Sequence, residues 1–238
     1  MGIFSKKKIS EEELQFQEEN RKALENFKVT KALGIKKIPT AWQFIYDEEN
    51  RNFVVERGPE EQFRDKNPYI VSYDQVLGVT LEIQETWSEE KGENALKGYG
   101  QLRQDKFDEV WWRYDFFLTI ETDHPYAKNI RYKMNEFKTI TKVPNRKSIF
   151  FRRGFELGGT YSAAELPALI EKMEKLFDDE AKTIHGDKVF ATITQTRPDS
   201  LMERLEDDFR DDIYLKKIDN MIKHVKRANR IAKILSCR

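Results

Sequence analysis

Residues 110–121 read VWWRYDFFLTIE, and this segment decides the fold. From Val110 to Ile120 every second residue is large and apolar, and most of the residues between them are polar. Successive side chains of a β-strand point to opposite faces, so a period of two predicts a strand with one buried face. Trp111 and Phe117 then lie on the other face, where a flanking helix could cover them or a ligand could reach them. We expect a cover, because large exposed apolar patches are uncommon.

The same period of two appears on both sides of this segment. Residues 42–46 and 53–55 alternate around a polar turn at residues 47–51, which predicts a β-hairpin. Further strands are predicted at residues 77–83, 130–134 and 148–155. The first of these is expected to turn one face to the core and one to water.

Capping signals predict helices before and after these strands. Ser10 and Glu13 form a capping box that predicts a helix over residues 10–33, which Gly34 would end in a left-handed conformation. Ser200 and Glu203 predict the start of a C-terminal helix in the same way.

A third capping box, Ser162 with Glu165, follows the last predicted strand. An apolar face at helical spacing predicts that this helix covers a sheet. His185 and Gly186 are predicted to end it, and residues 188–196 are predicted to be a strand or an extended connection. The residues of its apolar face are Leu166, Leu169, Ile170, Met173, Leu176 and Phe177.

The C-terminal region is strongly polarised in charge. Residues 199–212 hold seven acids and two bases, whereas residues 213–238 hold eight bases and one acid. Beside these bases runs an apolar seam at alternating steps of four and three, which is typical of a coiled coil. The seam residues, predicted to bind a partner, are Tyr214, Ile218, Met221, Val225, Ala228, Ala232 and Leu235. The basic residues that could instead contact an anionic surface are Lys216, Lys223, Lys226, Arg227, Arg230 and Lys233.

Composition restricts the class of protein. The 238 residues carry 42 Lys and Arg against 42 Asp and Glu, so no overall field steers the chain onto nucleic acid. A single cysteine, Cys237, excludes an intramolecular disulfide and a cysteine-rich zinc site. No run approaches the roughly 18 consecutive apolar residues of a membrane span, and the first residues lack the apolar stretch of a signal peptide. We therefore expect a soluble, cytoplasmic protein that does not favour nucleic acid.

No catalytic or metal-binding motif can be assembled. His124, His185 and His224 are not paired at the spacing of metal ligands, and each is expected to cap an element or to face solvent. The acids at residues 207–212 lack the alternating oxygen ligands and glycine of a calcium loop. The sequence therefore predicts no metal, no cofactor and no enzymatic activity.

The central part of the chain resembles a known domain. The segments IVSYDQVLGVTL (70–81), FFLTIET (116–122), NIRY (129–132) and YSAA (161–164) are similar to the pleckstrin-homology-like (PH-like) domain of uncharacterised bacterial proteins. The resemblance covers about residues 41–182 and implies an antiparallel barrel capped by one helix. Relatives often carry a cysteine-rich zinc ribbon ahead of this domain, which this chain lacks.

Together these observations predict an α+β protein. An antiparallel PH-like β-barrel or sheet, capped by an amphipathic helix, is expected at residues 38–184. A helical segment at 1–37 precedes it, and a connector with C-terminal helices follows at 185–238. We expect a non-enzymatic binding or scaffolding module of bacterial type, acting through contacts with a protein partner or through self-association. The alternative is a membrane-surface adaptor that binds anionic lipid through Lys6, Lys7, Lys8 and the basic C-terminal residues.

Overall fold

The computed structural model describes residues 10–35, 38–90, 109–136, 139–142, 155–194 and 200–236. For residues 89–90, 109–111, 139–142, 183–194 and 200–213 the description is of the backbone alone. The predicted strand at residues 148–155 and the lysines at residues 6–8 lie outside the described residues, except for Phe155.

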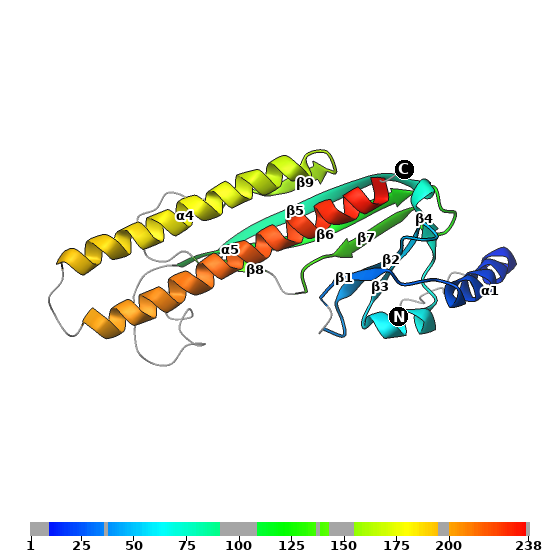
Figure 1. Cartoon of the computed structure of the whole chain (residues 1–238), viewed down its shortest axis with the longest axis horizontal. Helices are drawn as coiled ribbons and strands as arrows, with labels where there is room; N and C mark the ends of the chain where they lie inside the picture. Colours follow the sequence, from blue (N-terminus) through cyan, green and yellow to red (C-terminus); the bar gives the residue numbers. More distant parts are fainter. Residues whose placement is uncertain are drawn as a thin grey trace, which may run out of the picture. The chain divides into compact units, whose positions relative to one another are not determined.

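The chain divides into two compact units. Unit 1 consists of residues 1–79, 118–136 and 231–238, and unit 2 of residues 80–117 and 137–230. The chain contains two antiparallel sheets and several helices, so the protein is α+β, as predicted (Figure 1). The domain boundaries predicted at residues 37/38 and 184/185 stay predictions.

The first helix of unit 1, α1, is shorter than predicted. It spans Glu11–Glu25, and the Ser10 hydroxyl accepts a hydrogen bond from the Glu13 amide, as the capping signal indicates. The prediction that it continues to residue 33 is wrong, because Lys31–Gly34 form strand β1. Arg64 donates hydrogen bonds to the carbonyls of Leu24 and Phe27, so a side chain distant in the sequence satisfies the end of α1.

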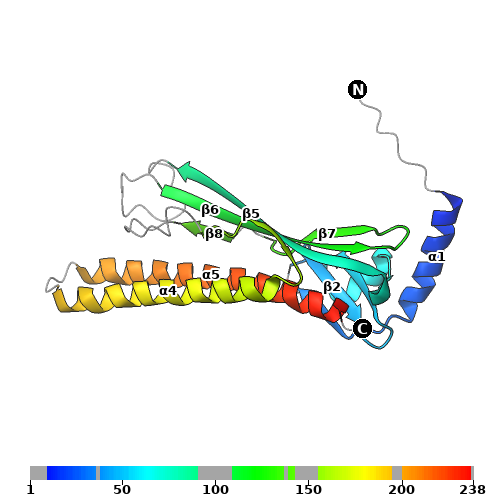
Figure 2. The same cartoon turned by 90° about the horizontal axis from the view of Figure 1, so that it is seen from above.

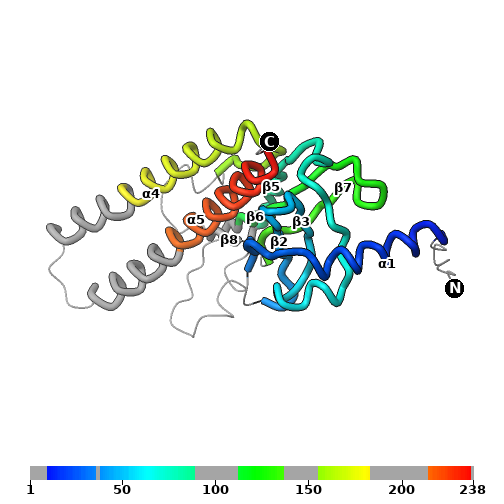
Figure 3. Tube along the Cα trace, turned by 45° about the vertical axis from the view of Figure 1, so that its right-hand side comes forward, coloured from blue at the N-terminus to red at the C-terminus, as the bar shows by residue number. Residues whose placement is uncertain are grey.

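The first sheet has the order β1, β2, β3, β4 and lies in unit 1. The trace runs from α1 into the hairpin of β2 (Trp42–Asp47) and β3 (Asn52–Arg57), the hairpin that the sequence predicts (Figure 3). Two short 3-10 helices, η1 (Glu60–Lys66) and η2 (Tyr73–Gln75), flank strand β4 (Val71–Ser72).

Both faces of β2 are buried, which the alternation in its sequence does not show. Ile45 on one face packs in a cluster with Leu24 and Phe27 of the α1 region. On the other face Phe44 stacks on Phe53, with ring centroids 5.2 Å apart. The α1 region thus covers the Ile45 face, and Phe44 and Phe53 are fully buried on the other face.

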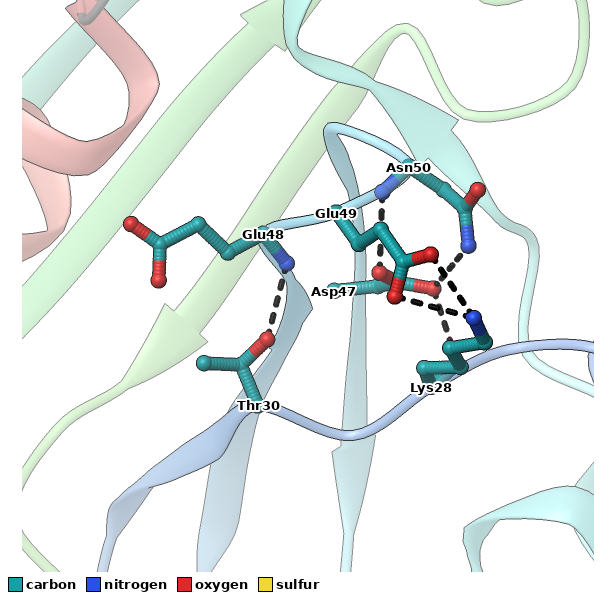
Figure 4. Close-up of polar contacts among 6 residues, drawn as sticks. All are labelled: Lys28, Thr30, Asp47, Glu48, Glu49 and Asn50. Atoms are coloured by element: carbon teal, nitrogen blue, oxygen red, sulfur yellow. Dashed lines mark hydrogen bonds and ion pairs between the residues drawn. The ribbon is translucent and has the colours of Figure 1, made fainter.

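The turn of this hairpin is held by a polar cluster (Figure 4). Buried Asp47 accepts hydrogen bonds from the amide of Lys28 at 2.8 Å, the amide of Asn50 at 3.0 Å and the Asn50 side chain at 2.7 Å. The Glu48 amide donates to the Thr30 hydroxyl at 2.9 Å, and the Lys28 ammonium pairs with Glu49 at 2.7 Å. Three of these contacts connect the turn to the segment that enters β1.

The second sheet has the order β7, β6, β5, β9, and β8 also pairs with β6. Strand β6 spans Glu109–Thr122, which confirms the strand predicted at residues 110–121, and Tyr114, Phe116, Leu118 and Ile120 are all fully buried. Its neighbours are β5 (Val76–Glu90), β7 (Asn129–Lys133), β8 (Thr139–Lys142) and β9 (Gly159–Ser162). The predicted inward row at residues 77–83 holds from Val79 onward, but Leu77 is exposed.

Two long helices complete the fold. Helix α4 spans Leu166–Thr194 and α5 spans Ser200–Ser236, and they lie side by side and antiparallel (Figure 1, Figure 2). The predicted end of α4 at His185 and Gly186 and the extended segment at 188–196 are wrong, because the helix continues to Thr194. A glycine inside a helix costs only about 1 kcal/mol, which packing overrides. At its start, Glu165 accepts hydrogen bonds from the amide and hydroxyl of Ser162.

The strand pairings do not close the sheets into a barrel. In the described residues β1 and β4 are the edges of the first sheet, and β7 and β9 are the ends of the path through the second. The barrel form of the prediction is therefore not seen, whereas antiparallel sheets followed by an amphipathic helix are. Of the helices in the described residues, none combines the length and apolar character that crossing a bilayer requires.

Candidate binding surface on the C-terminal helix

Helix α5 turns its apolar seam inward. All seven predicted seam residues are buried in the single chain, and so are three neighbours of the seam, Leu215, Ile222 and Ile231. An α-helix advances about 100° per residue, so this set covers a broad side of the helix rather than a narrow coiled-coil line. The predicted coiled-coil seam is thus occupied by contacts within the chain.

Contacts inside unit 2 show what holds this face. The ring of Tyr214 stacks on Phe155 with centroids 6.4 Å apart, and His224 lies 5.3 Å from the ring of Phe116 on β6. Helix α4 contributes a buried face of Leu166, Leu169 and Met173, three of the six residues predicted for it; the other three are half-buried.

The basic residues occupy the opposite side of α5. Lys216, Lys223 and Arg230 are seven residues apart, so each lies within about 20° of the one before it around the helix axis. Lys226, Arg227 and Lys233 flank this row. Five of the six are exposed and Arg227 is half-buried. We call these six residues the basic face of α5.

Two ion pairs and one polar contact orient this face. Lys223 pairs with Asp219 at 2.5 Å, and Lys226 pairs with Glu174 of α4 at 2.6 Å. All four of these side chains keep between 44% and 64% of their surface exposed, so each pair contributes little to stability. The guanidinium of Arg227 lies 3.0 Å from His224 Nδ1. From residue 214 to residue 236 Asp219 is the only acid in the sequence, so the face stays positive.

A buried carboxyl group lies beneath the helices, and the sequence analysis missed it. Glu180 on α4 is 5% exposed, and no side chain or backbone group in the described part of the chain forms a hydrogen bond with its Oε2 atom. Burial, with Asp179 adding to it, raises the pKa of Glu180 to about 6. Burial first and then Glu180 raise the pKa of Tyr214. The signal was present in the sequence, since Glu180 stands seven residues after Met173 on the apolar face.

The three histidines occupy different surroundings. His224 is half-buried, and burial followed by the charge of Arg227 lowers its pKa to about 3. His124 is 2% exposed in an aromatic cluster, so it does not face solvent; its ring accepts a hydrogen bond from the Tyr126 amide in the turn after β6, which is the capping role expected as one alternative. His185 lies in α4, in its backbone-only part. A neutral His224 adds no charge to the basic face.

A tryptophan pair is the other exposed feature of unit 2. Trp87 on β5 is 60% exposed, and its ring lies 6.4 Å from that of Trp112 on β6. Trp112 is half-buried and its Nε1 has no hydrogen-bond partner. Phe117 is half-buried on the other face, and the side chain of Trp111 lies outside the described residues. The predicted cover over the Trp111 and Phe117 face stays a prediction.

In the described part of the chain, no three His, Cys, Asp or Glu side chains lie close enough together to bind one metal ion. The side chains of the acids at residues 207–212 lie outside that part. Comparison with known proteins adds no identity: no family model, no curated protein and no solved structure matches the chain.

Proposed function

We propose that the chain is a non-enzymatic, cytoplasmic binding module that contacts an acidic protein surface through the basic face of α5. One observation carries this proposal: the six basic residues lie opposite the seam that fixes the helix within the chain, and five of them are exposed. A helix held by a buried face presents its outer side chains in a defined row, and charge complementarity then selects the partner.

The spacing of the row favours a helical partner. Lys216, Lys223 and Arg230 follow one another at about 10 Å along the axis, because each residue of an α-helix rises about 1.5 Å. An α-helix with Glu at every seventh position repeats at the same interval. Pairs of this kind determine partner choice and orientation in helix pairs more than they determine affinity.

A labelled helical peptide with Glu at every seventh position tests this proposal. Binding measured by fluorescence anisotropy should weaken at least tenfold in the triple variant Lys216→Glu, Lys223→Glu, Arg230→Glu, and should weaken in wild type when salt rises from 50 to 300 mM. The matched control, Arg21→Glu, Lys22→Glu, Lys31→Glu, makes the same change in net charge at exposed positions of unit 1. Equal weakening in both variants would show a net-charge effect only and would reject the proposed surface.

The second candidate is the membrane-surface adaptor. The exposed positive row supports it, since each Lys or Arg near an anionic surface contributes about 1 kcal/mol. On the described side chains of α5 no large apolar residue is exposed, so adsorption would be electrostatic, without insertion. Sedimentation with vesicles of phosphatidylserine and phosphatidylcholine distinguishes the two: pelleting of wild type but not of the triple variant, together with no binding of the peptide, would select the adaptor.

The PH-like fold and self-association through the seam are further proposals. Antiparallel strands followed by the amphipathic helix α4 support the PH-like order of elements. Self-association through the seam requires α5 to leave its buried position, as in a domain swap, because the same residues are covered within one chain. Light scattering on the full chain tests it, and a monomer at every concentration would reject it.

A further inference from the structure

Three aromatic rings of unit 1 enclose a buried histidine. Phe16 of α1 lies 5.4 Å from the ring of His124 in an edge-to-face arrangement, and 4.9 Å from Tyr126. Tyr69 lies 5.5 Å from His124 and stacks on Tyr126 at 5.9 Å. His124 is 2% exposed. One helix and two loops thus meet around an imidazole, and we call Phe16, Tyr69, His124 and Tyr126 the aromatic cluster.

The hydrogen bonds of His124 require the neutral ring. Its Nδ1 accepts a hydrogen bond from the Tyr126 amide at 3.2 Å, so the proton of the ring is on Nε2. Nε2 is buried, and no described residue forms a hydrogen bond with it. A protonated ring would place an N–H at Nδ1 against the Tyr126 N–H, and it would bury a positive charge among aromatic carbons. Burial lowers the pKa of His124, and Asp123 opposes this effect only in part.

The charged groups around the cluster do not compensate a positive ring. On α1 the nearest acid is Glu13, whose carboxylate accepts a hydrogen bond from the Tyr69 hydroxyl at 3.3 Å. In the turn of His124 itself, Asp123 and Lys128 are both exposed to solvent. Asp74, near the loop that bonds the Asp123 amide, pairs with Arg51.

The two halves of α1 are attached in different ways. Its second half is fastened by Asn20, which bonds Asn67, the Pro68 carbonyl and the Ile70 amide at 2.9–3.0 Å, and by the buried ring of Phe27 beyond its end. Its first half, residues 11–16, is held by Phe16 in the aromatic cluster and by a long, 3.3 Å bond from the Tyr69 hydroxyl to Glu13. Gln17 is already anchored, because its carbonyl accepts a hydrogen bond from the Asn67 side chain at 3.0 Å. Opening at the cluster can therefore free residues 11–16 while the rest of α1 stays in place.

We propose that His124 is an acid-sensitive latch, and that its protonation releases the first half of α1 from the aromatic cluster. A histidine whose pKa is lowered in the closed form leaves the latch closed at every pH above about 6.5, the ordinary value for histidine. Below that pH the open population grows up to tenfold per pH unit, because the open form binds one more proton. Opening exposes Phe16, Tyr69 and Tyr126.

Amide hydrogen exchange on the full chain tests the latch. We expect the protection of amides 14–19, corrected for intrinsic exchange, to fall by up to tenfold per pH unit from pH 6.5 to 5, while amides of β2 change less than twofold. His124→Phe keeps an aromatic ring without a titrating group and should remove this dependence. His224→Phe is the matched control. It removes a half-buried histidine of unit 2 and should leave the pH dependence of exchange in α1 unchanged.

A second measurement keeps the inference testable if His124→Phe does not fold. In wild type the NMR titration of the His124 ring should have a midpoint below 6.5, and the α1 amide shifts should follow the same midpoint. The proposal is overturned if His124 titrates near 6.5 with no response in α1, or if the His124→Phe variant retains the wild-type pH profile.

Discussion

Asp47 in unit 1 and Glu180 in unit 2 are both buried carboxyl groups, and their pKa values are shifted in opposite directions. Burial alone would raise the pKa of Asp47, but hydrogen bonds from Asn50 and from the Lys28 amide together lower it. Glu180 is also buried, and among the described residues its Oε2 atom has no hydrogen-bond partner. Its pKa rises to about 6.

The difference shows that hydrogen-bond donors can outweigh burial in deciding the charge of a buried acid. Asp47 stands at the end of a strand, where a turn leaves backbone amides unpaired and close to it. Glu180 stands in the middle of a helix, where every nearby amide is already bonded within the helix. A buried carboxylate at a turn can therefore stay charged and stabilise the fold through these hydrogen bonds. A carboxyl group buried against a helix lacks such donors, so its ionisation costs stability.

The largest effect is expected from removing Asp47. Asp47→Ala leaves three donors without an acceptor, the Lys28 amide and the amide and side chain of Asn50, and should lower the free energy of unfolding of unit 1 by about 3 kcal/mol. Urea-dependent exchange of the β2 and β3 amides measures it. The control is Glu49→Ala, which removes an exposed ion pair from the same turn and should leave stability nearly unchanged. Equal losses in both variants would contradict the special role of Asp47.

A smaller effect on stability, confined to low pH, tests the charge of Asp47 separately from the shape of its side chain. Because the folded pKa of Asp47 is lowered, its carboxylate stabilises unit 1 above the unfolded value of about 3.9, and this contribution is lost as pH falls through the folded pKa. Asp47→Asn should be less stable at pH 7 and should lose less stability than wild type on acidification below pH 4. Parallel pH profiles of the two proteins would show that the charge of Asp47 does not contribute.

The smallest expected change in the free energy of unfolding is a gain in stability, and it concerns Glu180. The raised pKa of Glu180 means that the protonated form stabilises unit 2 below the unfolded value of about 4.3, and that this stabilisation is lost as pH rises through about 6. Glu180→Gln is neutral at every pH and should raise the stability of unit 2 at pH 7 by about 1–2 kcal/mol. Denaturation of wild type and variant at pH 4 and pH 7 measures it; a variant that is less stable at pH 7 would contradict the argument.

The elements that sequence analysis placed well are those with a local cause. The strand at residues 110–121 and the hairpin at 42–57 follow from periods of two, and the cap at Ser10 from one side chain close to its own helix. The wrong predictions concern features that depend on residues far away in the sequence. The first helix was extended over residues 31–34 because nothing nearby shows that β2 pairs with them.

The candidate surface was partly predictable for the same reason. The seam and the bases of α5 are visible as periodicity, and the structure places them on opposite sides of one helix. Only the tertiary structure shows that the seam is covered within the chain, because an apolar heptad row could pack equally well on a partner. The aromatic cluster brings together residues 16, 69, 124 and 126, which no spacing rule connects.

By itself the sequence determined which segments alternate as strands, where several helices begin, and how charge is distributed along the C-terminal helix. These properties depend on residues within one or two turns of each other, whose side chains share a face through backbone geometry alone. Only the tertiary structure decided that both faces of β2 are buried, that α4 continues through Gly186, and which buried acids and histidines have partners. Burial and hydrogen-bond donors come from segments far along the chain, and no local pattern shows them.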